Sequence, residues 1–212
     1  SKWRDEMSQH WNELYAQTQD LYGTAANLFI QEIAEKIRIE GKTLAIAEGE
    51  GRNILYLAEQ ARQHNYPFSA EVWDYSDVAL KHLSSKAEAT GINLELRHVD
   101  LTAAKWPSER YQNVICVFGH FDTETQTKVL EGIRKSLLNG GWFIGELYSK
   151  EQINYKTGGP KNIEYLYDPW DILQVFKQDH IHHFYVGEQE RQEGELHCGK
   201  CHVIQFAIQV MK

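Results

Sequence analysis

The feature that most constrains the fold is a short apolar run that leads directly into a turn with two glycines. Residues 43–47 have the length and composition of a buried strand, and Glu48-Gly49-Glu50-Gly51 follows them. The next apolar residues recur at the spacing of one helical face: Ile54, Leu57, Ala58 and Ala61. This order of strand, tight glycine turn and helix is typical of a parallel sheet with a nucleotide-like ligand at its strand ends.

The same alternation continues along the chain. Short apolar runs at residues 68–73, 94–99, 114–118 and 142–147 predict strands, and helical spacing predicts helices at residues 27–39, 78–89 and 129–137. Asn139-Gly140-Gly141 is the expected end of the last of these helices, and Asp168-Pro169 is the expected start of another. Residues 181–188 and 203–210, joined by residues 190–202, predict a terminal antiparallel hairpin. We therefore expect an α/β, Rossmann-like, doubly wound and mostly parallel sheet.

Composition indicates an ordinary globular protein with one domain spanning residues 1–212. Its formal net charge is −8, which argues against a nucleic-acid partner because counterion release requires a basic face. No apolar run approaches the ~18 residues of a transmembrane helix, and the charged N-terminus has no signal core. Three cysteines argue against a closed disulfide framework. We expect a cytoplasmic protein without a membrane partner; the sequence does not indicate its oligomeric state.

The charges of the glycine turn distinguish two classes of ligand. A dinucleotide site has a third glycine where this chain has Ile54, and the carboxylates of Glu48 and Glu50 would repel a pyrophosphate. S-adenosylmethionine (SAM) carries a sulfonium and an ammonium but no phosphate, so it suits the turn better. Asp74, at the end of the second strand, can accept both ribose hydroxyls, a device that NAD sites share. Asp100, which ends the third strand, suits the adenine amino group. For both acids the alternative is helix capping or plain solvation after a strand.

With these motifs the sequence resembles the class I SAM-dependent methyltransferases, and among them the small-molecule branch of tellurite-resistance-like and thiopurine-like enzymes. The resemblance covers nearly the whole chain, and its pieces include Tyr22-Gly23-Thr24, Arg52-Asn53, Asp74-Tyr75-Ser76, Asp100-Leu101, Val117-Phe118-Gly119-His120-Phe121 and Glu146-Leu147-Tyr148. It implies a seven-stranded sheet, SAM as the cofactor and a small-molecule methyl acceptor. It also implies cofactor contacts from Tyr22, Ala47, Glu48, Gly49, Gly51, Asn53, Asp74, Tyr75, Asp100, Leu101 and Phe118.

Two positions depart from the family's first motif. Ala45 stands where the family has an acid near the SAM amino group, and Ala47 stands where it has its first glycine. Glu48 or Glu50 is the candidate replacement for the lost carboxylate. Without a replacement, cofactor affinity would be lowered. The alternative function is then a protein that binds SAM or S-adenosylhomocysteine but transfers no methyl group. A nicotinamide-dependent oxidoreductase is the third alternative, and Ile54 and the loop glutamates argue against it.

The acceptor side of the predicted site follows the fourth and fifth strands. The methyl group of SAM is already activated, so alignment of the reactants is the main requirement for its transfer. His120, with an unperturbed pKa of roughly 6.5, is the candidate general base, and a packing or capping histidine is the alternative. Phe118 and Phe121 flank it as candidate walls or as core residues. Tyr148 is a candidate acceptor-pocket residue, and residues 157–160 form either a mobile acceptor loop or a surface turn.

Aromatic residues near the N-terminus form a second candidate feature of the acceptor side. Trp11, Tyr15 and Tyr22 lie in a predicted helical lid segment, residues 1–40. The alternative is an amphipathic helix that packs on the edge of the sheet.

The run His197-Cys198-Gly199-Lys200-Cys201-His202 has several interpretations. Its Cys-x-x-Cys-His pattern occurs in c-type haem attachment, and one such pair could also supply half of a zinc site. The family resemblance makes His197 a candidate active-site residue. We expect a Gly-Lys turn with cysteines as small apolar residues, and no metal.

Overall fold

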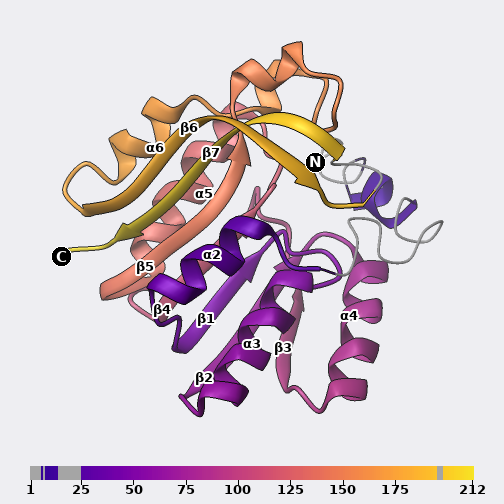
Figure 1. Cartoon of the computed structure of the whole chain (residues 1–212), viewed down its shortest axis with the longest axis vertical. Helices are drawn as coiled ribbons and strands as arrows, with labels where there is room; N and C mark the ends of the chain where they lie inside the picture. The colour runs from indigo at the N-terminus through magenta and orange to yellow at the C-terminus, as the bar shows by residue number, and fades with distance from the viewer. Residues whose placement is uncertain (1–5, 7, 14–24, 195–197) are drawn as a thin grey trace.

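A seven-stranded sheet forms the centre of the computed structural model, which describes residues 6, 8–13, 25–194 and 198–212. The strands are β1 (Gly41–Ile46), β2 (Phe68–Asp74), β3 (Leu94–His98), β4 (Tyr111–Val117), β5 (Leu137–Tyr148), β6 (His180–Gln192) and β7 (Cys198–Gln209). Their order across the sheet is β3-β2-β1-β4-β5-β7-β6 (Figure 1). Strands β1 to β5 pair in parallel, and β7 is antiparallel to both β5 and β6. The predicted doubly wound sheet with a terminal hairpin is confirmed.

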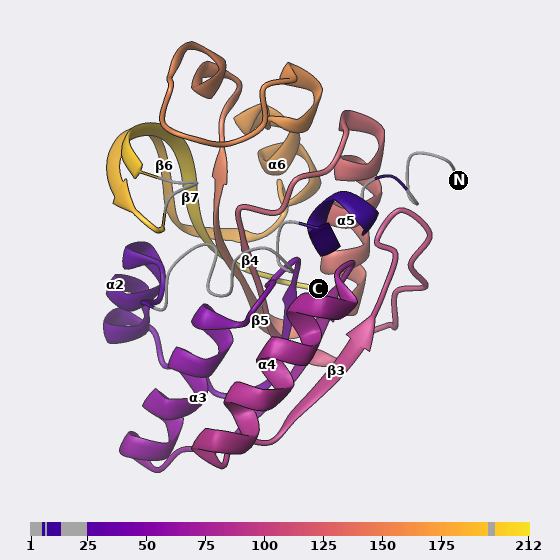
Figure 2. The ribbon, with the colours of Figure 1, turned by 90° about the vertical axis from the view of Figure 1, so that its right-hand side faces the viewer.

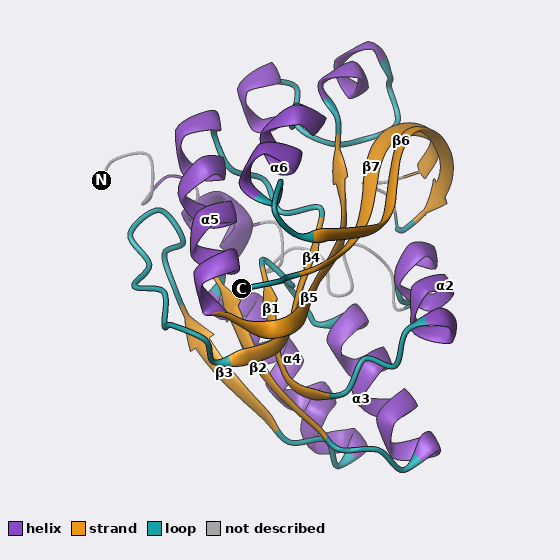
Figure 3. Cartoon of the chain, turned by 90° about the vertical axis from the view of Figure 1, so that its left-hand side faces the viewer, coloured by secondary structure: helices purple, strands orange, loops and turns teal. Residues whose placement is uncertain are grey.

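Helices cover both faces of this sheet, as Figure 3 shows. One face carries α2 (Leu28–Lys36), α3 (Arg52–His64) and α4 (Asp77–Thr90), and the other carries α5 (Thr123–Ser136) and α6 (Pro169–Val175). Two short 3₁₀ helices, η1 (Lys150–Asn154) and η2 (Ile163–Tyr165), follow β5. Each face of the sheet has its own apolar core, which explains why β1 and β4 end in unbroken apolar runs, residues 44–46 and 114–117.

The strand order reverses between β1 and β4, which pair side by side. Figure 2 shows the edge strand β3 beside α4. The chain winds outward from β1 through β2 to β3, and in the other direction from β4 to β5. Because the connections leave β1 and β4 toward opposite sides, a crevice forms at the carboxyl ends of these two strands. The glycine turn after β1 and the segment after β4 therefore meet at the same place.

The junction between α5 and β5 differs from the prediction. Helix α5 ends at Ser136 and β5 begins at Leu137, so Asn139-Gly140-Gly141 lies within the strand rather than at a helix end. The Gly140 N–H donates to the Val210 carbonyl, and the Gly141 carbonyl accepts from the Val210 N–H. Pairing with the C-terminal strand thus outweighs the local helix-stop signal.

The terminal hairpin is longer than predicted. Strand β6 continues to Gln192 and β7 begins at Cys198, so most of the predicted connection at residues 190–202 lies in paired strands. The predicted Gly199-Lys200 turn is therefore wrong, because both residues pair with β6. Among the residues that the structure describes, no helix combines the length and the apolar character needed to cross a bilayer.

Candidate cofactor and acceptor site

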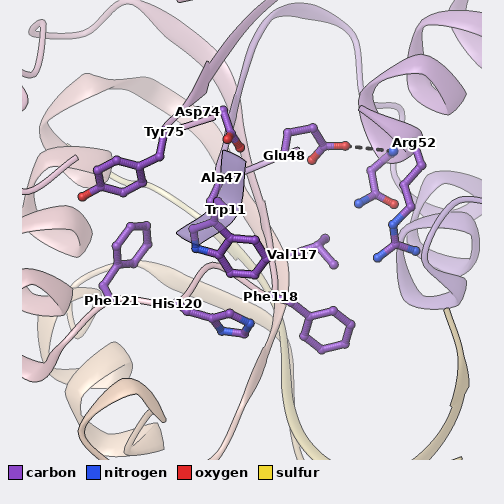
Figure 4. Close-up of a pocket in the computed structure, with 11 residues that line it drawn as sticks. Trp11, Ala47, Glu48, Arg52, Asp74, Tyr75, Val117, Phe118, His120 and Phe121 are labelled. Atoms are coloured by element: carbon purple, nitrogen blue, oxygen red, sulfur yellow. Dashed lines mark hydrogen bonds between the residues drawn. The ribbon is translucent and has the colours of Figure 1, made fainter. Parts of the chain in front are cut away.

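A pocket opens at the carboxyl ends of β1, β2 and β4 (Figure 4). Its lining contains several of the predicted site residues, namely Ala47, Glu48, Asn53, Asp74, Tyr75, Phe118 and His120. Four other side chains complete it: Trp11, Arg52, Val117 and Phe121. The fold thus brings together the turn after β1, the end of β2 and the segment after β4, as the sequence predicted.

The glycines of the turn after β1 are required by the backbone and by packing rather than by the pocket lining. Gly51 caps α3 with φ +79°, and a Cβ there would lie 2.3 Å from the Leu83 side chain. The Gly49 N–H donates to Asp74 Oδ2 at 2.7 Å. Ala47 has φ +51°, a left-handed conformation that alanine adopts rarely and glycine adopts readily. The backbone of this turn thus holds a conformation that favours glycine although the residue carries a Cβ.

Glu48 places a buried carboxylate in the pocket. Its Oε1 accepts the N–H groups of Asn53 at 2.8 Å and of Ile54 at 3.0 Å, at the start of α3. Its Oε2 is buried and has no hydrogen-bond partner among the described residues. Burial raises the pKa of the Glu48 carboxyl to about 7. A buried oxygen that lacks a donor suits a cationic ligand group, because such a group would stabilise the charged form.

Glu50, the other candidate replacement for the missing acid, lies outside this pocket. Its carboxylate is 3.3 Å from His82 Nδ1 and 3.4 Å from Lys86 Nζ, both on α4. The left-handed backbone at Gly49 separates the two glutamates and directs them to different neighbours. Of the two candidate replacements for an acid at Ala45, Glu48 is therefore the one that lines this pocket.

Asp74 closes the opposite end of the turn. Its Oδ2 accepts the Gly49 N–H and its Oδ1 accepts the Ser76 N–H at 2.9 Å, and burial raises its pKa. Each carboxylate oxygen has a further lone pair, so the side chain can still accept hydroxyl groups of a ligand. The hydrogen bond to Gly49 also ties the end of β2 to the glycine turn, which fixes both parts of the pocket relative to each other.

The two residues predicted to contact adenine lie outside the pocket lining. Asp100 Oδ1 accepts the N–H of Thr102 at 3.0 Å and its hydroxyl at 2.6 Å. Leu101 is part of the apolar core on the α5 face. Asp100 closes a local turn and caps no helix, because residues 101–103 are not helical. The adenine contacts of both residues stay predictions.

Aromatic rings form the wall of the pocket beside β4. The Phe118 backbone has φ +53°, a strained conformation for this residue type. Its ring stacks on Tyr148 with centroids 4.5 Å apart. The His120 ring lies between Tyr148 at 6.1 Å and Trp11 at 5.9 Å. Burial lowers the pKa of His120 to about 4, so its ring is neutral at pH 7 and a weak proton acceptor.

Residues 8–13 are helical and lie over the segment that follows β2. The Ser8 hydroxyl donates to the Tyr75 carbonyl at 3.0 Å, and Asn12 Oδ1 accepts the Ser76 hydroxyl at 2.7 Å. These contacts carry Trp11 into the pocket, as the lid prediction requires. The predicted lid segment 1–40 also includes α2, which packs instead on the sheet. Tyr15 and Tyr22 lie outside the described residues.

The segment at residues 157–160 is anchored to β7. The Thr157 hydroxyl donates to the Lys200 carbonyl at 2.7 Å, and the Thr157 carbonyl accepts the Cys198 N–H at 3.1 Å. A Cβ on Gly159 would lie 2.9 Å from the Tyr148 ring. This segment therefore supports Tyr148 from outside, and Tyr148 itself is buried behind the pocket wall rather than part of its lining.

The cysteine pair lies in an extended strand. Cys198 is exposed and Cys201 is buried. Residues three apart in a strand point to opposite faces, so these sulfurs do not converge on one metal ion or on a haem edge. Cys201 acts as a small buried residue in the core of the α3 face. His197 lies outside the described residues.

Sequence reasoning missed the contribution of Arg52 to the pocket. Arg52 follows the glycine turn directly, so its place at the start of α3 was a usable signal. Its side chain lines the pocket and donates to Glu193, which is 141 residues away along the chain. No local pattern marks Glu193, because only the hairpin fold brings it to this position.

The fold and the pocket define a Rossmann-like protein of the class I methyltransferase type, with a buried acid where a phosphate-binding loop would need a neutral or cationic surface. The comparisons agree with this class. Residues 43–141 match the family described as methyltransferase domain. This match, which spans just under half of the chain, identifies a methyltransferase domain. No curated protein sequence matches it significantly.

Solved structures share the fold at low sequence identity. One is a structure described under the conversion of a disulfide bond into a thioacetal group during echinomycin biosynthesis. It has a TM-score of 0.75 and 14% identity, and the alignment covers 97% of this chain and 92% of that chain. TehB from Haemophilus influenzae has a TM-score of 0.69 and 16% identity, over 94% of this chain and 67% of its own. Magnesium protoporphyrin IX methyltransferase (ChlM) from Synechocystis PCC 6803, with bound SAM, has a TM-score of 0.67 and 14% identity. The alignment covers 98% of this chain and 96% of that chain.

Proposed function

We propose that the chain transfers the methyl group of SAM to a small-molecule acceptor by in-line displacement. The observation that carries this proposal is the buried Oε2 of Glu48, which has no hydrogen-bond partner in the part of the chain that the structure describes. It lies at one end of a pocket whose other end is aromatic. The carboxylate suits the ammonium of SAM. The aromatic faces suit its sulfonium and methyl group, because a cation is attracted to the face of a π-system.

Each residue of the pocket has a defined part in holding the reactants. SAM supplies a methyl group on a positively charged sulfur, which keeps the electron pair of the broken bond when the nucleophile of the acceptor forms the new one. Glu48 would bind the ammonium, and Asp74 would accept hydrogen bonds from the ribose hydroxyls. Trp11 and Phe118 would exclude water from the methyl group, so that the acceptor is the nucleophile in line with the sulfur.

The chemistry around His120 indicates the class of acceptor. The residues that line the pocket beside it are apolar, namely Trp11, Val117, Phe118 and Phe121. A neutral ring with a pKa of about 4 can orient an acceptor by a hydrogen bond but takes up protons poorly at pH 7. The acceptor would therefore have an apolar body and a nucleophile with a free electron pair at neutral pH, such as a thiolate. The names of two structural neighbours, which mention echinomycin and a protoporphyrin, also support a small-molecule acceptor.

The test has a binding step and a transfer step. Isothermal titration with SAM and with S-adenosylhomocysteine should give saturable binding of both. Formation of S-adenosylhomocysteine should then be measured with aromatic thiols, amines, phenols and carboxylates of matched size, and thiols should react fastest. Absence of binding at millimolar ligand would overturn the proposal. Binding without transfer to any acceptor of the panel would favour the non-catalytic alternative, and fastest transfer to phenols would refute the assignment of His120.

A further inference from the structure

Arg52, the first residue of α3, links the pocket to the end of the β6–β7 hairpin. Its side chain lines the pocket, and its Nη1 donates to Glu193 Oε1 and to the Ala25 carbonyl. The side chains of Arg52 and Glu193 are only 9% and 5% exposed. Because water is largely excluded from this ion pair, the direction of the guanidinium depends on the protein groups around it.

Glu193 is itself held by a buried network. Asn27 Nδ2 donates to Glu193 Oε1 at 3.0 Å and to Glu146 Oε2 at 2.9 Å. Arg191 donates to both oxygens of Glu146, and Glu146 is fully buried. Two carboxylates are thus balanced by two guanidinium groups. The position of Arg52 therefore depends on β5, on the hairpin and on the segment before α2.

The end of the pocket beside α3 presents two opposite charges. Glu48 contributes its unpaired oxygen, and the positive charge of Arg52 lowers the pKa of Glu48 against the larger effect of burial. Figure 4 shows both side chains at the same end, away from Phe121. A carboxylate beside a guanidinium is complementary to the ammonium and carboxylate of an α-amino acid, which is the form of the methionine end of SAM.

We propose that Arg52 binds the α-carboxylate of SAM and that Glu193 is a positioning residue that holds Arg52 for this contact. The inference rests on the proposed function, because it assigns the amino-acid end of the same cofactor. Both described contacts of Arg52 use Nη1, whereas a guanidinium has three further N–H donors on Nε and Nη2. Glu193 would thus act through Arg52, without contact to the ligand.

Two ligands separate this role from a general effect on the pocket. S-adenosylhomocysteine has the amino-acid end, and 5′-methylthioadenosine has the same adenosine but lacks that end. Arg52→Met should weaken S-adenosylhomocysteine about 10- to 100-fold, the range for a lost charge-assisted contact. Glu193→Gln should weaken it about 5- to 10-fold, because Arg52 remains but loses its charged anchor. Both variants should bind 5′-methylthioadenosine within about twofold of the wild type, since it makes no such contact.

A matched control and a double variant complete the experiment. Glu188→Gln removes a charge from the same hairpin, where Glu188 forms an exposed pair with Lys200 at 3.5 Å, and it should change neither affinity. In the Arg52→Met background, Glu193→Gln should change the affinity for S-adenosylhomocysteine by less than about twofold, since its effect passes through Arg52. Unaltered binding of 5′-methylthioadenosine also shows that a variant is folded.

The possible results separate this inference from the proposed function. Equal weakening of both ligands by Glu193→Gln, or no weakening of S-adenosylhomocysteine, overturns the positioning role while the proposed function stands. Loss of all ligand binding with Glu193→Gln but not with Arg52→Met also overturns it, because Glu193 would then serve the fold. A wild-type protein that binds neither ligand overturns the proposed function and this inference together.

Discussion

If Glu48 binds the ammonium of the cofactor as proposed, its raised pKa should make cofactor affinity depend on pH. Its pKa of about 7 means that about one site in eleven is ionised at pH 6 and about ten in eleven at pH 8. Only the ionised form pairs with an ammonium. The apparent Kd for S-adenosylhomocysteine should therefore rise about tenfold as the pH falls from 8 to 6. Glu48→Gln should remove this slope and weaken binding about 10- to 100-fold at pH 8.

The same carboxyl should affect the stability of the protein without ligand. Its folded-state pKa is raised from 4.5 to about 7, so the neutral form is favoured in the folded protein. The contribution of this carboxyl to the free energy of unfolding is fully present below its unfolded-state pKa. That contribution is lost as the pH rises through 7. The difference between the two pKa values corresponds to about 3 kcal/mol of unfolding free energy. Bound ligand should offset this loss, because the ammonium stabilises the charged form.

Thermal unfolding and titration calorimetry from pH 5 to 8, on wild type and Glu48→Gln, measure both effects. Glu50→Gln is the matched control, because Glu50 belongs to the same turn but pairs with His82 and Lys86 outside the pocket. This control should keep the wild-type slope of affinity with pH. An affinity of the wild type that stays constant between pH 6 and 8, or an equal slope in Glu48→Gln, would refute the reasoning.

Three further predictions follow from single residues. The rate of methyl transfer should show no ionisation of His120 between pH 5.5 and 8, because burial lowers its pKa to about 4; a step near pH 6.5 that His120→Gln abolishes would contradict this. Ala47→Gly should stabilise the protein by about 1 kcal/mol in urea unfolding, since glycine adopts φ +51° without strain, and cofactor affinity should stay unchanged; a loss of stability would contradict it. Glu71→Gln should destabilise the fold by about 2–3 kcal/mol, because this buried carboxylate accepts three side-chain hydrogen bonds. Burial raises the pKa of Glu71, but these hydrogen bonds outweigh it and lower the pKa below its usual value. The contribution of Glu71 should thus be lost as the pH falls through that lowered pKa, and acid unfolding at the same midpoint in wild type and variant would contradict the prediction.

The elements of the fold could be predicted where local signals and tertiary pairing agree. Asp168 caps α6 as expected, and Gly91 ends α4 in the left-handed conformation. The prediction failed where pairing between distant segments prevailed. Gly140 and Gly141 look like a helix stop, but the C-terminal strand pairs with them and makes them part of β5. The hairpin was predicted too short for the same reason, because ladder hydrogen bonds continue through polar residues that carry no strand signal.

In the candidate site, too, local features could be predicted from the sequence, and features that depend on distant segments could not. The acidic glycine turn and the strand-end Asp74 predict a SAM pocket from the chain alone, since both chemistry and spacing are local. The choice between Glu48 and Glu50 could not be made from the sequence. Both are glutamates of the same turn, and only the backbone conformation decides which side chain points into the pocket. The low pKa of His120 also depends on its burial among Tyr148 and Trp11, which come from different parts of the chain.

The order of residues by itself determined the class of sheet, and it predicted the place of the ligand and the sign of the ligand's charge. These follow from periodicity and from side-chain chemistry within a few residues. Only the tertiary structure decided that Arg52 meets Glu193, and that Asn27, which also donates to Glu146, holds Glu193. Buried ion pairs join segments more than a hundred residues apart, and their energy depends on the exclusion of water, which exists only after the chain has folded.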